Sequence, residues 1–189
     1  MSVAALAPWI LTVSGRRFDL LAPTVDSIDA GDIAHALSQV NRFGGHTRVP
    51  YSVAEHSLLV SRIVPVGFAL AGLLHDAAEA YVGDVVGPLA CRLPAFLEIE
   101  ARILDAVAIR FSVPRSLFHS PEVRRADRVA LLTERRDLLP PSPEPWAEDI
   151  LGIEPDAHRI RPVQPQIARD MFLERLVDLT AGGRVGAVA

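Results

Sequence analysis

The stretch Gly72-Leu73-Leu74-His75-Asp76-Ala77-Ala78-Glu79 places two metal-binding side chains next to each other behind an apolar run. The run predicts a core helix, in which ionised carboxylates are rarely buried unless they are paired or bound to a metal. His56 lies upstream and Asp127 downstream, in segments with the same helical pattern. Imidazole and carboxylate form an N/O ligand set suited to first-row divalent ions. One metal ion would therefore account for the whole H…HD…D series.

Length and composition indicate a single domain, 1–189, because half of the 189 residues are hydrophobic and can form a sizeable core. No run of about 18 uncharged apolar residues is present that could span a bilayer. Cys91 is the only cysteine, which excludes an intrachain disulfide and suits a reducing compartment. Residues 1–11 lack a basic region and a cleavage pattern and are interpreted as mature sequence. We therefore expect a cytoplasmic protein without a membrane partner.

The charge pattern argues against a broad nucleic-acid surface, because the formal net charge is −4. All basic residues are arginines, whose planar fork suits bidentate phosphate contacts. A cluster on one predicted helix forms either a basic stripe or a solvated face with acidic partners, and the second interpretation is favoured. The cluster comprises Arg124, Arg125, Arg128, Arg135 and Arg136, with Glu122, Glu134 and Asp137 as its expected partners.

The pattern along the chain predicts a small hairpin over 9–21 followed by a helical core over 29–138. Asn41 to Gly45 forms a loop. Ser52 and Glu55 form a capping box at the start of the helix that carries His56, so Glu55 is interpreted as structural.

Four more helices complete the predicted all-α architecture, and one of them ends just before Gly83, a favourable residue just past a helix. Ser120 is the expected N-cap of another. The segment 140–145 contains four prolines and predicts a loop. The helices are expected at about 67–82, 94–111 and 121–138, with a last one at about 164–180.

Further candidate site residues surround the metal ligands. Glu79 lies three residues after Asp76, on the same face of the predicted helix, and is interpreted as a general base or acid; the alternative is an ion pair with an arginine on a neighbouring helix. Asp84 has either a functional role or caps the next turn. Arg42 and Phe43 are candidates for a phosphate clamp and a stacking surface.

The order His56, His75-Asp76, Asp127 resembles the HD-domain metal-dependent phosphohydrolases. The stretches Asn41-Arg42-Phe43, Val53 to Ser57 and His75 to Asp84 are similar to the bacterial 5′-deoxynucleotidase branch, and other segments resemble phage- or prophage-associated HD hydrolases. The similarity covers about half of the chain. Phe43 departs from that branch, which usually has tryptophan there.

The resemblance implies that His56, His75, Asp76 and Asp127 bind one divalent transition metal, chosen from Mn, Co, Fe, Ni and Zn. It further implies that Glu79 assists the attacking water, Asp84 contacts the sugar or leaving group, and Arg42 holds phosphate. The expected enzyme hydrolyses the phosphate ester of (deoxy)nucleoside 5′-monophosphates. A homo-oligomer is expected, because such relatives often form one.

Two alternatives stay open. A dNTP triphosphohydrolase of the phage-related dATP type would need more cations, for which Arg48, His46, Arg16 and Arg17 are the candidates. The alternative of another class is a non-catalytic HD module that binds a nucleotide in the same pocket. The partner in each case is a small-molecule nucleotide, and no stable nucleic-acid complex is expected.

Overall fold

The computed structural model describes residues 8–182, so most of the segment 1–11 interpreted above as mature sequence lies outside the described residues. The chain is mostly helical and carries one two-stranded antiparallel sheet, as the sequence predicted. Within 8–182, no helix has the length and apolar character needed to cross a bilayer. The helices are α1 (Ala30–Gln39), α2 (Val53–Ile63), α3 (Ala69–Leu74), α4 (Glu79–Val82), α5 (Gly87–Ala90), α6 (Pro94–Arg110), α7 (Pro121–Leu138), α8 (Ala147–Ile150) and α9 (Pro165–Gly182).

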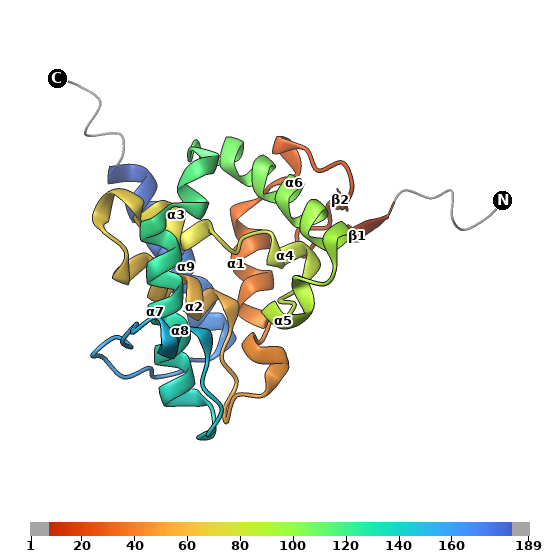
Figure 1. The fold of residues 1–189 in the computed structure, drawn as a ribbon. Coiled ribbons are helices and arrows are strands. Elements are labelled where there is room, and N and C mark those ends of the chain that lie inside the picture. The colour runs from red at the N-terminus through yellow and green to blue at the C-terminus, as the bar shows by residue number, and fades with distance from the viewer. Residues whose placement is uncertain (1–7, 183–189) are drawn as a thin grey trace.

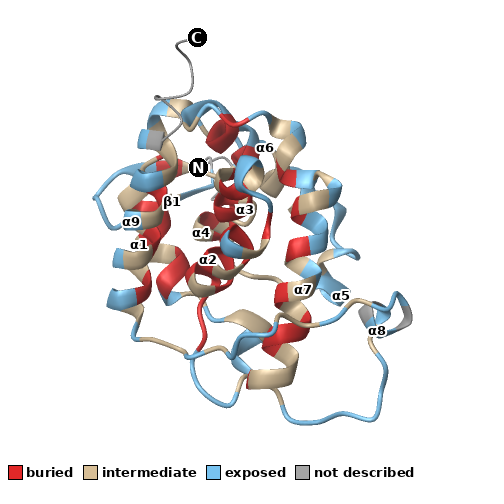
Figure 2. Cartoon of the chain, turned by 90° about the vertical axis from the view of Figure 1, so that its left-hand side faces the viewer, coloured by how far each residue is buried: buried red, intermediate tan, exposed pale blue. Residues whose placement is uncertain are grey.

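Helix α2 is the central element, because it packs against α1, α3, α7 and α9 (Figure 1). Val53, Ala54 and Val60 on α2 are fully buried, as are Ile33 on α1 and Phe172 on α9. Figure 2 shows the buried parts of α1, α2 and α7 in red toward the interior of the helical assembly, while α5 and α8 lie at its exposed edge. Residues on α2 are thus held by packing from several sides.

Helix starts follow the predicted capping signals. The Asp29 side chain accepts hydrogen bonds from the amides of Gly31 and Asp32 at the start of α1. At the start of α2, the Ser52 hydroxyl accepts from the Glu55 amide at 3.3 Å, and the Glu55 carboxylate accepts from the Ser52 amide at 2.9 Å. Ser120 accepts from the Val123 amide at the start of α7. The structural interpretation of Glu55 is therefore confirmed.

The N-terminal hairpin consists of β1 (Trp9–Leu11) and β2 (Arg17–Asp19), with Ile10 opposite Phe18. Asp32 on α1 accepts hydrogen bonds from the backbone and the hydroxyl of Ser14, which fastens the turn to the helices. Phe18 is 1% exposed, and its ring stacks on Tyr81 of α4 with 3.8 Å between centroids. The hairpin therefore packs directly against the helix that begins at Glu79.

The predicted continuous helix over 67–82 is wrong. A 3-10 turn at Val66–Phe68 leads into α3, which ends at Leu74, and α4 begins only at Glu79. The intervening backbone forms tighter bonds, such as the Glu79 amide to the Asp76 carbonyl. The His75 ring donates a hydrogen bond from Nδ1 to the Gly72 carbonyl oxygen at 2.9 Å. In a regular helix this oxygen would accept from a backbone amide instead. This competition ends α3 at the metal-binding dipeptide.

Gly72 also marks a close approach of α3 to α2. A Cβ atom at this position would lie 3.1 Å from Val64 Cγ1 and 3.4 Å from the backbone of Ser61. The first contact is tighter than ordinary van der Waals packing, and the second lies at its lower limit. The absence of a side chain at Gly72 thus allows the two helices to meet.

The segment between α7 and α9 is largely irregular, and residues 140–145 form the loop that was predicted. Arg136 on α7 donates to the carbonyls of Asp156 and His158, and Asp137 accepts from the Ile160 amide. These bonds hold the segment along α7 before α9 packs onto α1. The last helix begins one residue later than predicted, at Pro165.

Replacing Phe18 by alanine is expected to lower the free energy of unfolding by about 3 kcal/mol, because the ring is buried and stacked on Tyr81. Leu11→Ala in the same hairpin is the control, since Leu11 is 67% exposed, and its effect should stay below about 0.5 kcal/mol. Urea unfolding of both variants measures the difference. Equal effects would show that the hairpin does not depend on Phe18 for its packing.

Candidate metal centre

His56 is the most deeply placed residue of the candidate centre, with an exposed fraction of 0%. Its Nδ1 donates to Glu134 Oε1 at 2.6 Å, which fixes the ring. Its Nε2 lies 3.4 Å from His75 Nε2, 3.4 Å from Asp76 Oδ2 and 3.3 Å from Asp127 Oδ1. The His56 ring therefore directs Nδ1 toward Glu134 and Nε2 toward the three other predicted ligands.

His75 has the same orientation with a different partner. Its Nδ1 donates to the Gly72 carbonyl, and its Nε2 lies 3.2 Å from Asp76 Oδ1 and 4.0 Å from Asp127 Oδ1. A histidine that donates through Nδ1 presents a lone pair at Nε2 when neutral, which is the form that binds metals. Both histidines thus direct Nε2 to one point.

Asp127 lies in the middle of α7, as predicted, and its side chain is 43% exposed. Burial of the carboxyl group raises the pKa of Asp127, but the hydrogen bond to His56 and the positive charges nearby outweigh it and lower the pKa well below the usual range. Asp127 is therefore an anion that contacts both histidines.

The donor set fits a divalent ion. The ligand atoms of His56, His75 and Asp76 all lie within 4.8 Å of one another, so this trio could hold a metal ion. Bonds from nitrogen to such an ion are about 2.0–2.1 Å long, so two nitrogens 3.4 Å apart can share one ion that sits off the line between them. Two lone pairs this close without a cation or proton between them would repel each other.

Burial and the Arg42 charge lower the pKa of His56, but Glu134 and Asp127 outweigh them and raise it to about 9. In the metal-free protein, a proton on His56 Nε2 therefore points toward Asp76 and Asp127. It takes the position that a bound cation would have. Metal and proton therefore compete for the same position.

Glu134 is the functional residue that the sequence analysis missed. It was interpreted as a partner of a solvated arginine cluster, but it is 0% exposed and receives hydrogen bonds from His56 and, at 3.2 Å, from Arg42. Asp137 does pair with Arg136, as that interpretation expected, and it also holds the segment after α7 through Arg159 and the Ile160 amide. Spacing along the helix could have placed Glu134 on the Asp127 side of α7, two turns further on.

Arg42 reaches the centre from the loop before α2, where its amide donates to the Tyr51 carbonyl. Its NH1 lies 3.9 Å from both Asp76 Oδ2 and Asp84 Oδ2, while NH2 bonds Glu134. Burial lowers the pKa of Arg42, but these carboxylates outweigh it and raise the pKa, so the guanidinium stays charged. The structure thus brings Arg42 and Asp84 to the predicted ligands.

Acidic side chains crowd the same region. Burial, together with Asp76 and Asp84, raises the pKa of Glu79 well above its usual value, and its Oε2 is buried without a hydrogen-bond partner among the described residues. Burial raises the pKa of Asp84 although Arg42 opposes it. Glu100 on α6 was not predicted, and burial with the same two aspartates raises its pKa to about 7.

Phe43 adopts a left-handed backbone with φ of 56°, which is uncommon for a non-glycine residue. The Arg42 guanidinium lies 5.4 Å from the centre of its ring, and the ring of Trp146 lies 6.3 Å away. Trp146 follows the Pro-rich loop and was not identified from the sequence. Together the two rings form an aromatic surface beside Arg42.

The structure does not bring the other predicted cations to the cluster. Arg48 is exposed, its amide donates to the Leu138 carbonyl, and its side chain lines a hollow with Arg135 and Arg136. Arg16 pairs with Asp29, and Arg17 covers the Trp9 ring in the hairpin. His46 is exposed on the loop after Phe43.

Comparison with known proteins finds relatives that match the chain over most of its length. It is 38% identical over 174 residues to the uncharacterized protein YfdR of Escherichia coli, a match that covers 91% of this chain and 96% of that protein. The chain belongs to the YfdR family. An uncharacterized protein of Rhodobacter capsulatus is 36% identical over 187 residues, covering 88% of this chain and 93% of its own. No model of a known protein family matches the chain.

The metal-free form of this YfdR-family protein is expected to lose stability as the pH rises from 6.5 to 9. The pKa of His56 is about 9 in the folded protein and about 6.5 when unfolded, so its contribution is fully present below pH 6.5 and is lost as the pH passes 9. The loss is on the order of 3 kcal/mol. Urea unfolding with a chelator present measures it, and His56→Gln should flatten this part of the curve. An unchanged slope in that variant would assign the effect to another group.

Glu134→Gln is expected to weaken Zn²⁺ or Co²⁺ binding about 10- to 100-fold, because the partner that orients His56 loses its charge. Competition with a chromophoric chelator measures the affinity. Glu122→Gln on the same helix is the control, since Glu122 lies in the first turn of α7, and its affinity should stay unchanged. If both variants bind metal as tightly as the parent chain, Glu134 does not orient the ligand.

Proposed function

We propose that the chain is an HD-domain metal-dependent phosphohydrolase that acts on (deoxy)nucleoside 5′-monophosphates. The observation that carries this proposal is the meeting of His56, His75, Asp76 and Asp127, in the order of the H…HD…D series, at distances of 3.2–4.0 Å. Each histidine directs Nε2 into this cluster. Four residues from three separate segments rarely converge in this way without a shared ligand.

The four residues would hold one divalent ion, and His/Asp donors suit Mn, Co, Fe, Ni and Zn alike. When bound, the ion supplies a Lewis acid that polarises a phosphoryl oxygen and makes water more acidic. The chain itself must then hold the phosphate, manage the proton and place the rest of the nucleotide.

Arg42 is suited to hold the phosphate. Its NH1 lies 3.9 Å from Asp76 and Asp84, beyond direct hydrogen-bond distance, so it is free to donate to a phosphoryl oxygen. Glu134 fixes the other end of the guanidinium. A preoriented cation offsets the negative charge that develops on the phosphoryl group during transfer.

Glu79 is suited to handle the proton. Its Oε2 is buried beside Asp76 and lacks a partner among the described residues, so it can accept a proton from the attacking water. The water oxygen bonds to phosphorus, the ester P–O bond breaks, and the leaving oxygen takes a proton, which yields a nucleoside and inorganic phosphate. Asp84 would contact the sugar or this leaving group, with Phe43 and Trp146 offering an aromatic surface nearby.

One observation favours the dNTP triphosphohydrolase as the second candidate. Arg124, Arg125 and Arg128 flank Asp127 on α7 and line a hollow of about 500 Å³ with His119. These three arginines form no ion pair with any side chain that the structure describes, and they could bind a longer phosphate chain.

Product analysis distinguishes these functions. The metal-stripped protein is incubated with Mn²⁺ or Co²⁺ and with panels of dNMPs and dNTPs, and the products are identified by chromatography and mass. Nucleoside and inorganic phosphate from monophosphates support the proposal, whereas intact triphosphate released from dNTPs supports the second candidate. No turnover of either panel by the metal-loaded protein would favour the non-catalytic binding module.

Glu79→Gln is expected to lower kcat by about 10²- to 10⁴-fold, because the amide cannot accept a proton. Metal affinity should change little, since Glu79 is not one of the four proposed ligands. Glu98→Gln on α6 is the control, because Glu98 forms only a surface ion pair with Arg102, and its kcat should be unchanged. Full activity in the Glu79 variant would remove this residue from the mechanism.

A further inference from the structure

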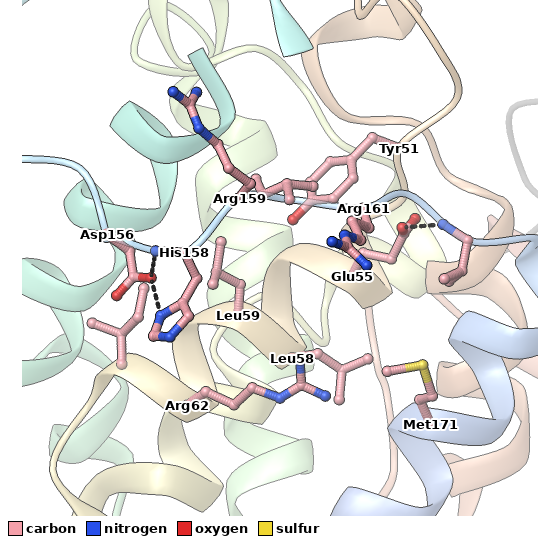
Figure 3. Close-up of a pocket in the computed structure, with 13 residues that line it drawn as sticks. Tyr51, Glu55, Leu58, Leu59, Arg62, Asp156, His158, Arg159, Arg161 and Met171 are labelled. Atoms are coloured by element: carbon pink, nitrogen blue, oxygen red, sulfur yellow. Dashed lines mark hydrogen bonds and ion pairs between the residues drawn. The ribbon is translucent and has the colours of Figure 1, made fainter. Parts of the chain in front are cut away.

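A second cavity lies away from the metal centre, between α2, the segment 156–163 and α9 (Figure 3). Its volume is about 550 Å³, within the range of small-molecule sites. None of the four proposed metal ligands lines it, nor does Arg42. It therefore has walls of its own and is not an extension of the candidate metal centre.

The cavity is rich in basic side chains, although the chain as a whole carries a formal net charge of −4. Arg62, Arg159, Arg161 and His158 line it. Arg159 is held by Asp137, but Arg62 and Arg161 are exposed and form no ion pair with any of the described side chains. Two guanidinium groups at one cavity are thus available to an outside anion.

The two carboxylates that line the cavity are already engaged. Glu55 accepts hydrogen bonds from Ser52 through one oxygen and from the Val163 amide, at 2.9 Å, through the other. Asp156 Oδ1 accepts from the backbone and the ring of His158. These acids stabilise the walls, and neither of them forms an ion pair with Arg62 or Arg161.

The remaining walls are apolar and are formed by Leu58, Leu59, Ile63, Val163 and Met171. A cavity that combines apolar walls with unpaired guanidinium groups suits a ligand that has an apolar or aromatic body and an anionic group. Arginine forks pair with phosphate oxygens in a bidentate manner. A simple inorganic anion would leave the apolar walls without a partner.

We propose that this cavity is a second ligand site that binds an organic phosphate of nucleotide size, with the phosphate between Arg62 and Arg161. Tyr51 separates the two sites: its ring lines the cavity, and its carbonyl holds the amide of Arg42 at the metal centre. The proposal concerns binding alone and holds whether or not the metal centre hydrolyses phosphate esters.

Met171 allows a direct test, because it lines the cavity and the chain contains only two methionines, Met1 and Met171. The full chain is labelled with ¹³C at the methionine methyl groups, freed of metal to prevent turnover, and titrated with dAMP. The Met171 signal should shift saturably, and deoxyadenosine or inorganic phosphate alone should bind at least tenfold more weakly. A Met171 signal that stays in place at millimolar dAMP would overturn the proposal.

The double variant Arg62→Gln/Arg161→Gln should weaken dAMP binding at least tenfold by the same signal. Arg92→Gln/Arg102→Gln removes the same charge from exposed positions outside the cavity and should bind as the parent chain does. Binding that survives the first variant, or that deoxyadenosine reproduces in full, would show that the cavity does not recognise phosphate.

Discussion

The hydrogen bond between His56 and Glu134 joins α2 to α7 and determines the geometry of the metal centre. Both side chains are fully buried, and an isolated buried carboxylate costs several kcal/mol. Glu134 is compensated by two cationic partners, His56 and Arg42, which come from different segments. Removal of either partner would leave charge in the core. The same hydrogen bond therefore holds α2 against α7 and fixes the orientation of the His56 ring.

Several carboxyl groups lie close together near Asp76, next to the hydrogen bonds of Glu134 with His56 and Arg42. Burial, together with Asp76 and Asp84, raises the pKa of both Glu79 and Glu100, and Arg42 opposes this shift at Glu79. The folded chain thus tolerates carboxyl groups that repel one another in a low dielectric. Such local conflict is typical of functional sites, where a ligand supplies the missing charge. A divalent cation would relieve this repulsion.

Local signals explain what could be predicted from the sequence. Ser52 with Glu55, and Ser120 with Pro121, mark helix starts through contacts within one turn, and the periodic apolar residues mark the helices themselves. Glu134 was missed because its partner His56 lies 78 residues away and its neighbours Arg135, Arg136 and Asp137 suggest a solvated face. The end of α3 was missed because a side chain, not a glycine or proline, takes the backbone carbonyl. The catalytic role and the metal identity stay predictions.

Gly72 relates the packing of two helices to the chemistry of the cluster. Its carbonyl anchors the His75 ring, while its missing Cβ lets α3 rest against Ser61 and Val64 near the end of α2, the helix that carries His56. A methyl group here would press on Val64 and Ser61 and so push α3, which precedes His75, away from the end of α2. Because metal selectivity depends on the size and rigidity of the ligand cage, the helix spacing that Gly72 permits would bear on which ion the candidate centre could accept.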